Sequence, residues 1–124
     1  MWASENVFNR NDIPLLQPQA QQPLVLTMNC LNGYFVPPGA DSLSEELLGV
    51  EGKGAIAVFS PSGLSLHEPA QRYHEALVRA LVSGSHQRPG DALLEAQVAH
   101  ADTGAMPELL RLYHLFGDPA LSLR

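Results

Sequence analysis

The sequence contains very little cysteine. Cys30 is the single cysteine among 124 residues. One thiol cannot form an internal disulfide, and it cannot supply the several cysteines of a structural zinc site. The five histidines do not compensate, because no two of them stand four residues apart, which is the spacing of a helical zinc site. We therefore expect neither a metal nor any other cofactor.

Basic residues and long apolar runs are also scarce. Seven Lys and Arg stand against thirteen Asp and Glu, which gives a formal net charge of -6. An acidic surface does not attract phosphates, so nucleic acid is not an expected partner. No apolar run approaches the roughly 18 residues of a membrane span, and residues 1–10 contain no apolar core of a signal peptide. We expect no membrane partner, and the length predicts a single domain over residues 1–124.

The apolar runs in the first half predict an α/β fold. Leu24–Asn29 is a nearly continuous apolar run, typical of a strand buried on both faces. A second run, Ala55–Phe59, predicts another such strand. Between them, Leu43–Leu48 predicts a short helix that Asp41 or Ser42 can cap. Strand, helix and strand together predict a crossover unit with parallel strands.

Helical spacing of apolar residues dominates the second half. It predicts one helix from Pro69 to Gly84, a second over Asp91–Ala101 and a third over Met106–Phe116. Ala120–Leu123 predicts a short last strand. A helical turn ahead of the first strand is expected to begin at a cap. The residues that can supply this cap are Asn11 and Asp12.

These strands are few for a sheet whose strands are buried on both faces. Two explanations follow. Either strands of a larger parent protein are missing, or the chain forms a dimer through an exposed sheet edge.

Cys30 stands directly after the first predicted strand, in the sequence Asn29-Cys30-Leu31-Asn32-Gly33. Ligands and chemistry of open α/β sheets gather beyond the carboxyl ends of the strands, so the thiol is well placed to act as a nucleophile. The pair Asn32-Gly33 permits tight backbone geometry around the sulfur. The alternative is that Cys30 is a small buried hydrophobic residue that serves only packing.

A nucleophilic cysteine also needs a base, commonly a histidine, and donors for the oxyanion. His67 is the only candidate base, because it alone is predicted in a loop beyond a strand. The other four histidines are expected to be solvated or partly buried residues of the surface. They are His74, His86, His100 and His114.

Several segments resemble the gingipain-type cysteine peptidases of the caspase-like clan. Pro23–Phe35 is similar to their catalytic-cysteine strand, and Tyr113–Leu121 is similar to the Gly-Asp-Pro end of their catalytic domains. Ser44–Leu48, Gly54–Ser60 and Gly90–Leu93 follow the family's order, from about residue 2 onward. The resemblance implies part of a caspase-like three-layer α/β fold. Its mainly parallel sheet is flanked by helices, and its N-terminal strands are missing.

By this resemblance, Cys30 attacks a peptide carbonyl to form a thioester, and its own backbone N–H helps to hold the oxyanion. Residues after the second strand border the substrate pocket; they are Ser60, Pro61, Ser62 and Gly63. In the family, the base is a histidine in a His-Gly motif on a preceding strand, which this chain lacks. The resemblance therefore implies the C-terminal part of a cysteine endopeptidase that is inactive by itself, with His67 as an alternative base. It also implies a peptide or protein substrate for the complete enzyme and a bacterial, exported protein.

Two other interpretations remain open. One alternative is a CHAT-type caspase-like domain, although Gly117-Asp118-Pro119 favours the gingipain branch. The other is a non-catalytic interaction module that pairs its sheet edge with another chain, with Cys30 as packing. Substrate specificity is not predicted, because no acidic residue stands in Ser60–Leu66 to attract a basic side chain and Glu68 is only nearby.

Overall fold

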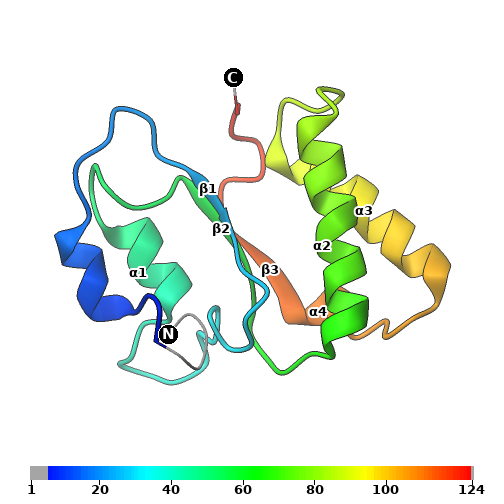
Figure 1. Cartoon of the computed structure of the whole chain (residues 1–124), viewed down its shortest axis with the longest axis horizontal. Helices are drawn as coiled ribbons and strands as arrows, with labels where there is room; N and C mark the ends of the chain where they lie inside the picture. Colours follow the sequence, from blue (N-terminus) through cyan, green and yellow to red (C-terminus); the bar gives the residue numbers. More distant parts are fainter. Residues whose placement is uncertain (1–5, 124) are drawn as a thin grey trace. The chain divides into compact units, whose positions relative to one another are not determined.

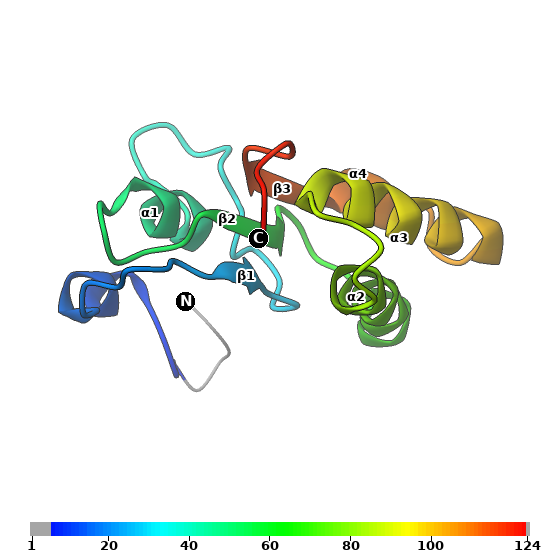
Figure 2. The same cartoon turned by 90° about the horizontal axis from the view of Figure 1, so that it is seen from above.

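The computed structural model describes residues 6–123 of the chain, which combine short strands with longer helices (Figure 1 and Figure 2). In chain order the elements are η1 (Arg10–Leu15), β1 (Leu24–Leu26), α1 (Leu43–Gly49), β2 (Ala57–Pro61), α2 (His67–Val82), α3 (Pro89–Thr103), α4 (Leu109–Leu112) and β3 (Tyr113–Gly117). No helix within residues 6–123 combines the length and the apolar character needed to cross a membrane. The predicted α/β class is confirmed.

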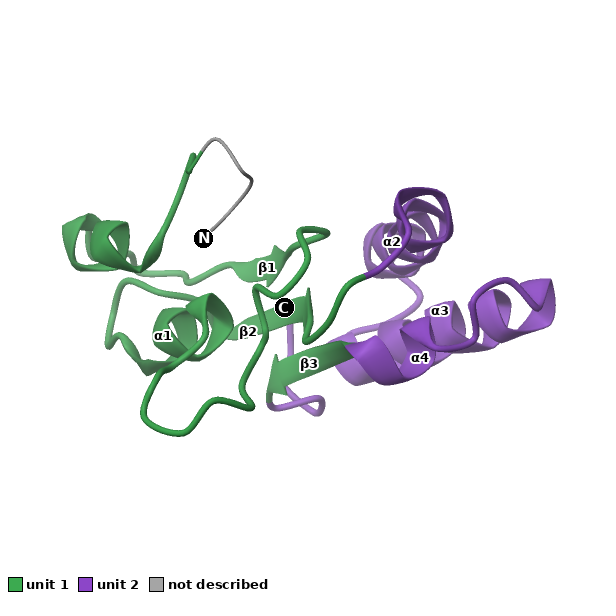
Figure 3. Cartoon of the chain, turned by 90° about the horizontal axis from the view of Figure 1, so that it is seen from below, with its two compact units in different colours: residues 1–64, 113–117 green, residues 65–112, 118–124 purple. Residues whose placement is uncertain are grey.

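The described chain divides into two compact units (Figure 3). Unit 1 is the described part of Met1–Leu64 together with Tyr113–Gly117, and it contains all of the strands named above. Unit 2 contains α2, α3 and α4. The single domain over residues 1–124 stays a prediction.

Within the described residues, unit 1 is built on a three-stranded sheet in the order β1-β2-β3. β1 and β2 are parallel, with Val25 opposite Val58, so the predicted strand-helix-strand unit is confirmed. β2 is buried along all five of its residues, whereas the three residues of β1 are only half-buried. The prediction that the first strand is buried on both faces is therefore wrong for Leu24–Leu26, because β1 lies at the edge of the described sheet.

Local capping explains where the first two helices begin. The hydroxyl of Ser42 accepts a hydrogen bond from the Glu45 amide, and the Glu45 carboxylate accepts one from the Ser42 amide at 2.7 Å. This reciprocal capping box confirms Ser42 as the cap of α1. The helical turn η1 is capped by Asn9 rather than by either residue predicted, because the Asp12 side chain instead accepts from the Asn9 amide at 2.8 Å.

The third predicted helix is mostly wrong. Only Leu109–Leu112 is helical, and Tyr113–Gly117 forms β3, which pairs antiparallel with β2 and sets Phe59 opposite Leu115. The run is apolar on nearly every side, so its periodicity does not separate helix from strand. Pairing decides the matter, because the buried backbone of β2 needs hydrogen-bond partners on both sides.

The last predicted strand, Ala120–Leu123, is also wrong. Its residues lie outside the strands of the structure, in a turn and an irregular segment. The Leu123 amide donates to the Gln87 carbonyl at 2.9 Å. The Ala120 and Leu121 amides both donate to Asp118, so the backbone of this segment is satisfied locally without a ladder to a neighbouring strand.

In unit 2, α2 packs against α3. Both helices were predicted, and each begins two residues earlier than expected, at His67 and at Pro89. Four of the nine buried residues of these helices are alanines, and the ring of Tyr73 stacks on that of His100, with centroids 5.0 Å apart. His74 and His100 are buried, so their predicted surface position is wrong. His74 contacts the Ala70 carbonyl through Nδ1 at 3.0 Å, which provides the polar partner that a buried ring requires.

Replacement of Leu77 with alanine is expected to lower the free energy of unfolding by about 2–5 kcal/mol, because it leaves a cavity in the buried face of α2. Val82 on the same helix is 75% exposed, so Val82→Ala is the matched control, with an expected change of less than about 0.5 kcal/mol. Urea unfolding followed by far-UV circular dichroism measures both. Equal losses at the two positions would contradict the assigned packing.

Candidate active site

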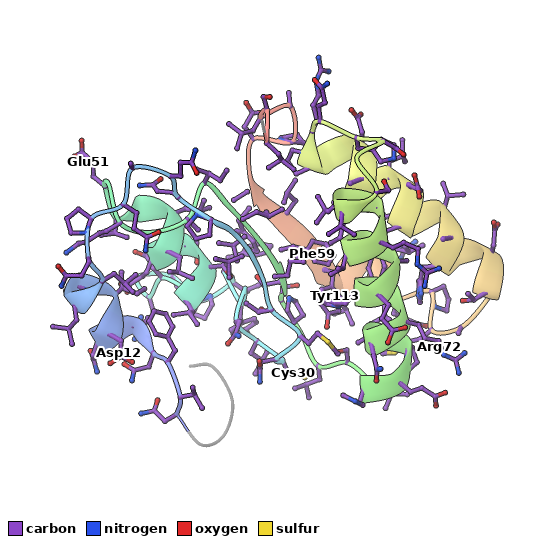
Figure 4. All side chains as sticks on the ribbon, turned by 45° about the horizontal axis from the view of Figure 1, so that its top comes forward. Asp12, Cys30, Glu51, Phe59, Arg72 and Tyr113 are labelled. Carbon is purple, nitrogen blue, oxygen red and sulfur yellow. The ribbon has the colours of Figure 1, made fainter. Side chains whose placement is uncertain are left out.

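Cys30, which is labelled in Figure 4, lies in the turn that follows β1. The Thr27 amide donates to the Phe59 carbonyl at 2.9 Å, which carries the parallel pairing one residue beyond β1. The chain then turns, and Cys30 is exposed. The interpretation of Cys30 as a buried packing residue is therefore wrong.

Two features fix the loop around Cys30. The Gly33 amide donates to the Pro61 carbonyl at 3.0 Å, which attaches the loop to the end of β2. Leu31, directly after the cysteine, has a φ of 65°, a left-handed conformation that a leucine rarely adopts. Such strain persists only where surrounding contacts determine the backbone, so the chain next to Cys30 is held in one conformation.

A buried polar network supports this loop from behind. Ser44, near the start of α1, donates to the Asn32 carbonyl through its amide at 3.1 Å and through its hydroxyl at 3.0 Å. The Ser44 and Ser60 hydroxyls lie 2.6 Å apart. Because the Ser44 proton is already donated to Asn32, Ser60 is the donor in this pair. The network joins α1, β2 and the loop of Cys30.

The side chain of Asn32 lies within the same buried region. It is 1% exposed, and neither its oxygen nor its nitrogen has a hydrogen-bond partner within residues 6–123. An unsatisfied buried amide costs about 1–3 kcal/mol. The loop is therefore not optimised for stability alone.

Gly33 is required by close packing. A Cβ atom at this position would lie 2.4 Å from the Ser60 hydroxyl and 2.7 Å from Cε2 of Phe116. No real side chain tolerates such contacts, so glycine alone allows the loop to approach the sheet this closely. The backbone freedom expected of Asn32-Gly33 is thus used for packing against β2 and β3.

The four predicted pocket residues divide into two pairs. Ser60 and Pro61 are buried at the end of β2, where they hold the loop of Cys30 through the contacts above. Ser62 and Gly63 follow β2 and are half-buried, so they are the members of the four with accessible surface. All four belong to unit 1, as does Cys30.

His114 is a site residue that the sequence interpretation missed. It lies on β3, and its Nε2 is 2.9 Å from the hydroxyl of Ser62. Its ring packs edge to face against Phe35, with centroids 5.4 Å apart, and against Phe116 at 6.2 Å. Burial lowers the pKa of His114. Had 113–117 been interpreted as a strand, the two-residue period would have placed His114 and Phe116 on one face.

His67, the predicted alternative base, is exposed at the start of α2 and belongs to unit 2. Its catalytic role stays a prediction. Within residues 6–123 no group of three or more His, Cys, Asp or Glu side chains could hold a metal ion.

Two solved structures of gingipain R share the fold of this chain. The chain is similar to the crystal structure of the Arg-specific cysteine proteinase gingipain R (RgpB), with a TM-score of 0.86 and 20% identity. It is also similar to the complex of the Porphyromonas gingivalis RgpB pro- and mature domains, with a TM-score of 0.82 and 19% identity. Each likeness covers 99% of this chain and 31% of the other. The chain thus has the fold of about a third of those proteins, as the resemblance implied.

The family follows from a second comparison. The model of peptidase family C25 matches residues 1–124, and the chain belongs to this family. None of the curated proteins matches the chain. Membership of C25 agrees with the gingipain resemblance and favours it over the CHAT-type alternative.

Gly33→Ala is expected to lower the free energy of unfolding by about 1–3 kcal/mol, because the added methyl group overlaps Ser60 and Phe116. Gly49→Ala is the matched control, since nothing lies within 4 Å of a Cβ there. Chemical denaturation of the two variants gives the comparison. A Gly33→Ala variant as stable as the control would show that the loop does not pack closely on the sheet.

The lowered pKa of His114 predicts a pH dependence of stability. The ring has its ordinary pKa of 6.5 in the unfolded chain and a lower pKa in the folded chain. As the pH falls, unfolded chains therefore take up the proton first. The free energy of unfolding should therefore fall as the pH drops through about 6.5, and His114→Gln should remove that part of the dependence. An NMR titration of the ring tests the cause directly. A midpoint at or above 6.5 would contradict it.

Proposed function

We propose that this chain is the C-terminal part of the catalytic domain of a cysteine endopeptidase, with Cys30 as its nucleophile. The observation that carries the proposal is the placement of an exposed thiol beyond the end of β1, on a loop fixed to β2. Membership of peptidase family C25 supports it. In this proposal the chain supplies the residue that becomes acylated, which is only one part of the active site.

The proposed reaction begins when the Cys30 sulfur attacks the carbonyl carbon of a peptide bond. A C–S bond forms, the C–N bond breaks, and the amine leaves with a proton. Water then hydrolyses the thioester and regenerates the thiol. The backbone N–H of Cys30 helps to hold the oxyanion, and the contacts of Gly33 with Pro61 and of Ser44 with Asn32 keep this donor in a fixed position.

Ser62 and Gly63 form the accessible wall of the proposed pocket for the residue before the scissile bond. Ser60 and Pro61 are buried and contribute by holding the loop of Cys30 in place. The Ser62 hydroxyl is oriented by His114. The arginine specificity of gingipain R is not extended to this chain, because Ser60–Leu66 contains no carboxylate to pair with a basic side chain.

The base is the missing component. A cysteine nucleophile needs a group that takes the thiol proton and later activates water. No histidine in the sequence is followed by glycine, so the His-Gly motif of the family is absent from these residues. We therefore expect the chain by itself to be acylated without completing catalytic cycles.

A second candidate function is an interaction module that pairs through its sheet edge. An apolar groove of about 600 Å³ in unit 1 runs beside β1, and Val25 and Leu47 are among its lining residues. In the described part of the chain β1 pairs only with β2, so its outer edge can accept a further strand. A second copy of the chain could supply this strand and form a dimer.

The nucleophile is tested with an activated acyl donor, p-nitrophenyl acetate. The chain is expected to release one equivalent of nitrophenolate and to carry one acetyl group on Cys30 by mass spectrometry, with no further turnover and no cleavage of peptides. Cys30→Ala should not be acetylated at this position.

Peptide cleavage that Cys30→Ala abolishes would contradict the expected inactivity of the chain, and its loss in His67→Ala would identify His67 as the base. No acetylation of Cys30 together with a dimer in sedimentation would favour the interaction module.

A further inference from the structure

Two of the three larger aliphatic side chains of α3, those of Leu94 and Val98, are exposed, whereas Leu93 is half-buried. The buried positions of α3 include the alanines Ala92 and Ala96, which pack within unit 2. Leu94 and Val98 are instead 60% and 54% exposed. A helix with apolar residues on two faces is usually covered on both, so the outer face of α3 is suited to a partner.

The exposed aliphatic residues lie in a groove of about 570 Å³, which we call the α3 groove. The residues that line it include His86, Asp91, Leu94, Glu95, Val98 and Asp102. Those on α3 stand at positions 91, 94, 95, 98 and 102, a spacing that places them on one face of the helix. Leu94 and Val98 are thus two apolar contact points on one face of α3.

Negative charge surrounds these contact points. Three carboxylates line the groove, and α3 contains no lysine or arginine. Among the lining residues the basic group is the ring of His86, whose Nε2 lies 2.6 Å from the Glu95 carboxylate; Arg88, at the N-terminal end of α3, does not line the groove. Asp91 and Asp102 flank the apolar centre towards the two ends of the helix.

We propose that the α3 groove binds a cationic amphipathic α-helix of a partner protein. Leu94 and Val98 contact the apolar face of that helix, and the carboxylates pair with lysines or arginines at its margins. The groove is formed by side chains of a helix and has no open strand edge, so it suits a helix rather than an extended peptide. Its acidic rim repels anionic lipid surfaces and nucleic acid, which carry the same charge.

The probe is a synthetic peptide of leucine and lysine about five helical turns long, with its leucines spaced to form one face. It is titrated into the ¹⁵N-labelled chain. NMR shift changes are expected at His86 and along α3. Leu94→Ser and Glu95→Lys should each raise Kd about tenfold, and added salt should weaken binding.

Three controls make the result specific. Val82→Ser alters an exposed aliphatic residue of α2 that does not line the groove, so Kd should not change. A peptide with glutamate in place of lysine should not bind. Circular dichroism verifies that the variants fold, which is expected because the altered side chains are exposed.

The proposal is overturned if the peptide does not bind, if its shift changes lie in the groove beside β1, or if Val82→Ser weakens binding as much as Leu94→Ser does. Equal binding of the glutamate peptide, or binding of the chain to vesicles of phosphatidylglycerol, would overturn it as well.

Discussion

The buried strand β2 is the constraint on which the rest of unit 1 depends. Its backbone pairs with β1 on one side and with β3 on the other. Its last two residues, Ser60 and Pro61, are also the attachment points of the loop that carries Cys30. The same five residues thus form the centre of the described sheet and hold the loop that carries the thiol. A change that shifts β2 would disturb the core and the candidate site together.

Local signals in the sequence were sufficient for a good part of this arrangement. The apolar runs around Val25 and Val58 predicted two parallel strands, and the Ser42 cap marked the start of the helix between them. The place of Cys30 after the first strand followed from the same pattern. Such features are encoded within a few residues, so a single sequence is enough to recover them.

The remainder depends on partners that are distant in sequence. Residues 109–116 are apolar on most sides, and only the need of β2 for a second neighbour makes the last part of them a strand. His114 could not be assigned to the site while its segment was interpreted as a helix. The contact of Gly33 with Phe116 and the pairing of Ser44 with Ser60 likewise join segments that are far apart in the chain. The two-face burial expected of β1 failed for a related reason, because burial depends on what lies beyond the sheet edge.

The loop of Cys30 departs from local rules at two adjacent positions. Leu31 adopts a left-handed conformation, and the buried amide of Asn32 lacks a partner within the described chain. Such departures are expected where a sequence serves chemistry as well as stability. They set Cys30 apart from a cysteine that merely fills space, and they agree with membership of a cysteine peptidase family.

The central claim is that Cys30 is an accessible nucleophile on a fixed loop. The most direct test is the rate at which iodoacetamide alkylates Cys30 in the native chain, measured beside the rate in denaturant. The account predicts that the native chain is alkylated at Cys30 without unfolding. A thiol that resists alkylation until the chain unfolds would contradict it.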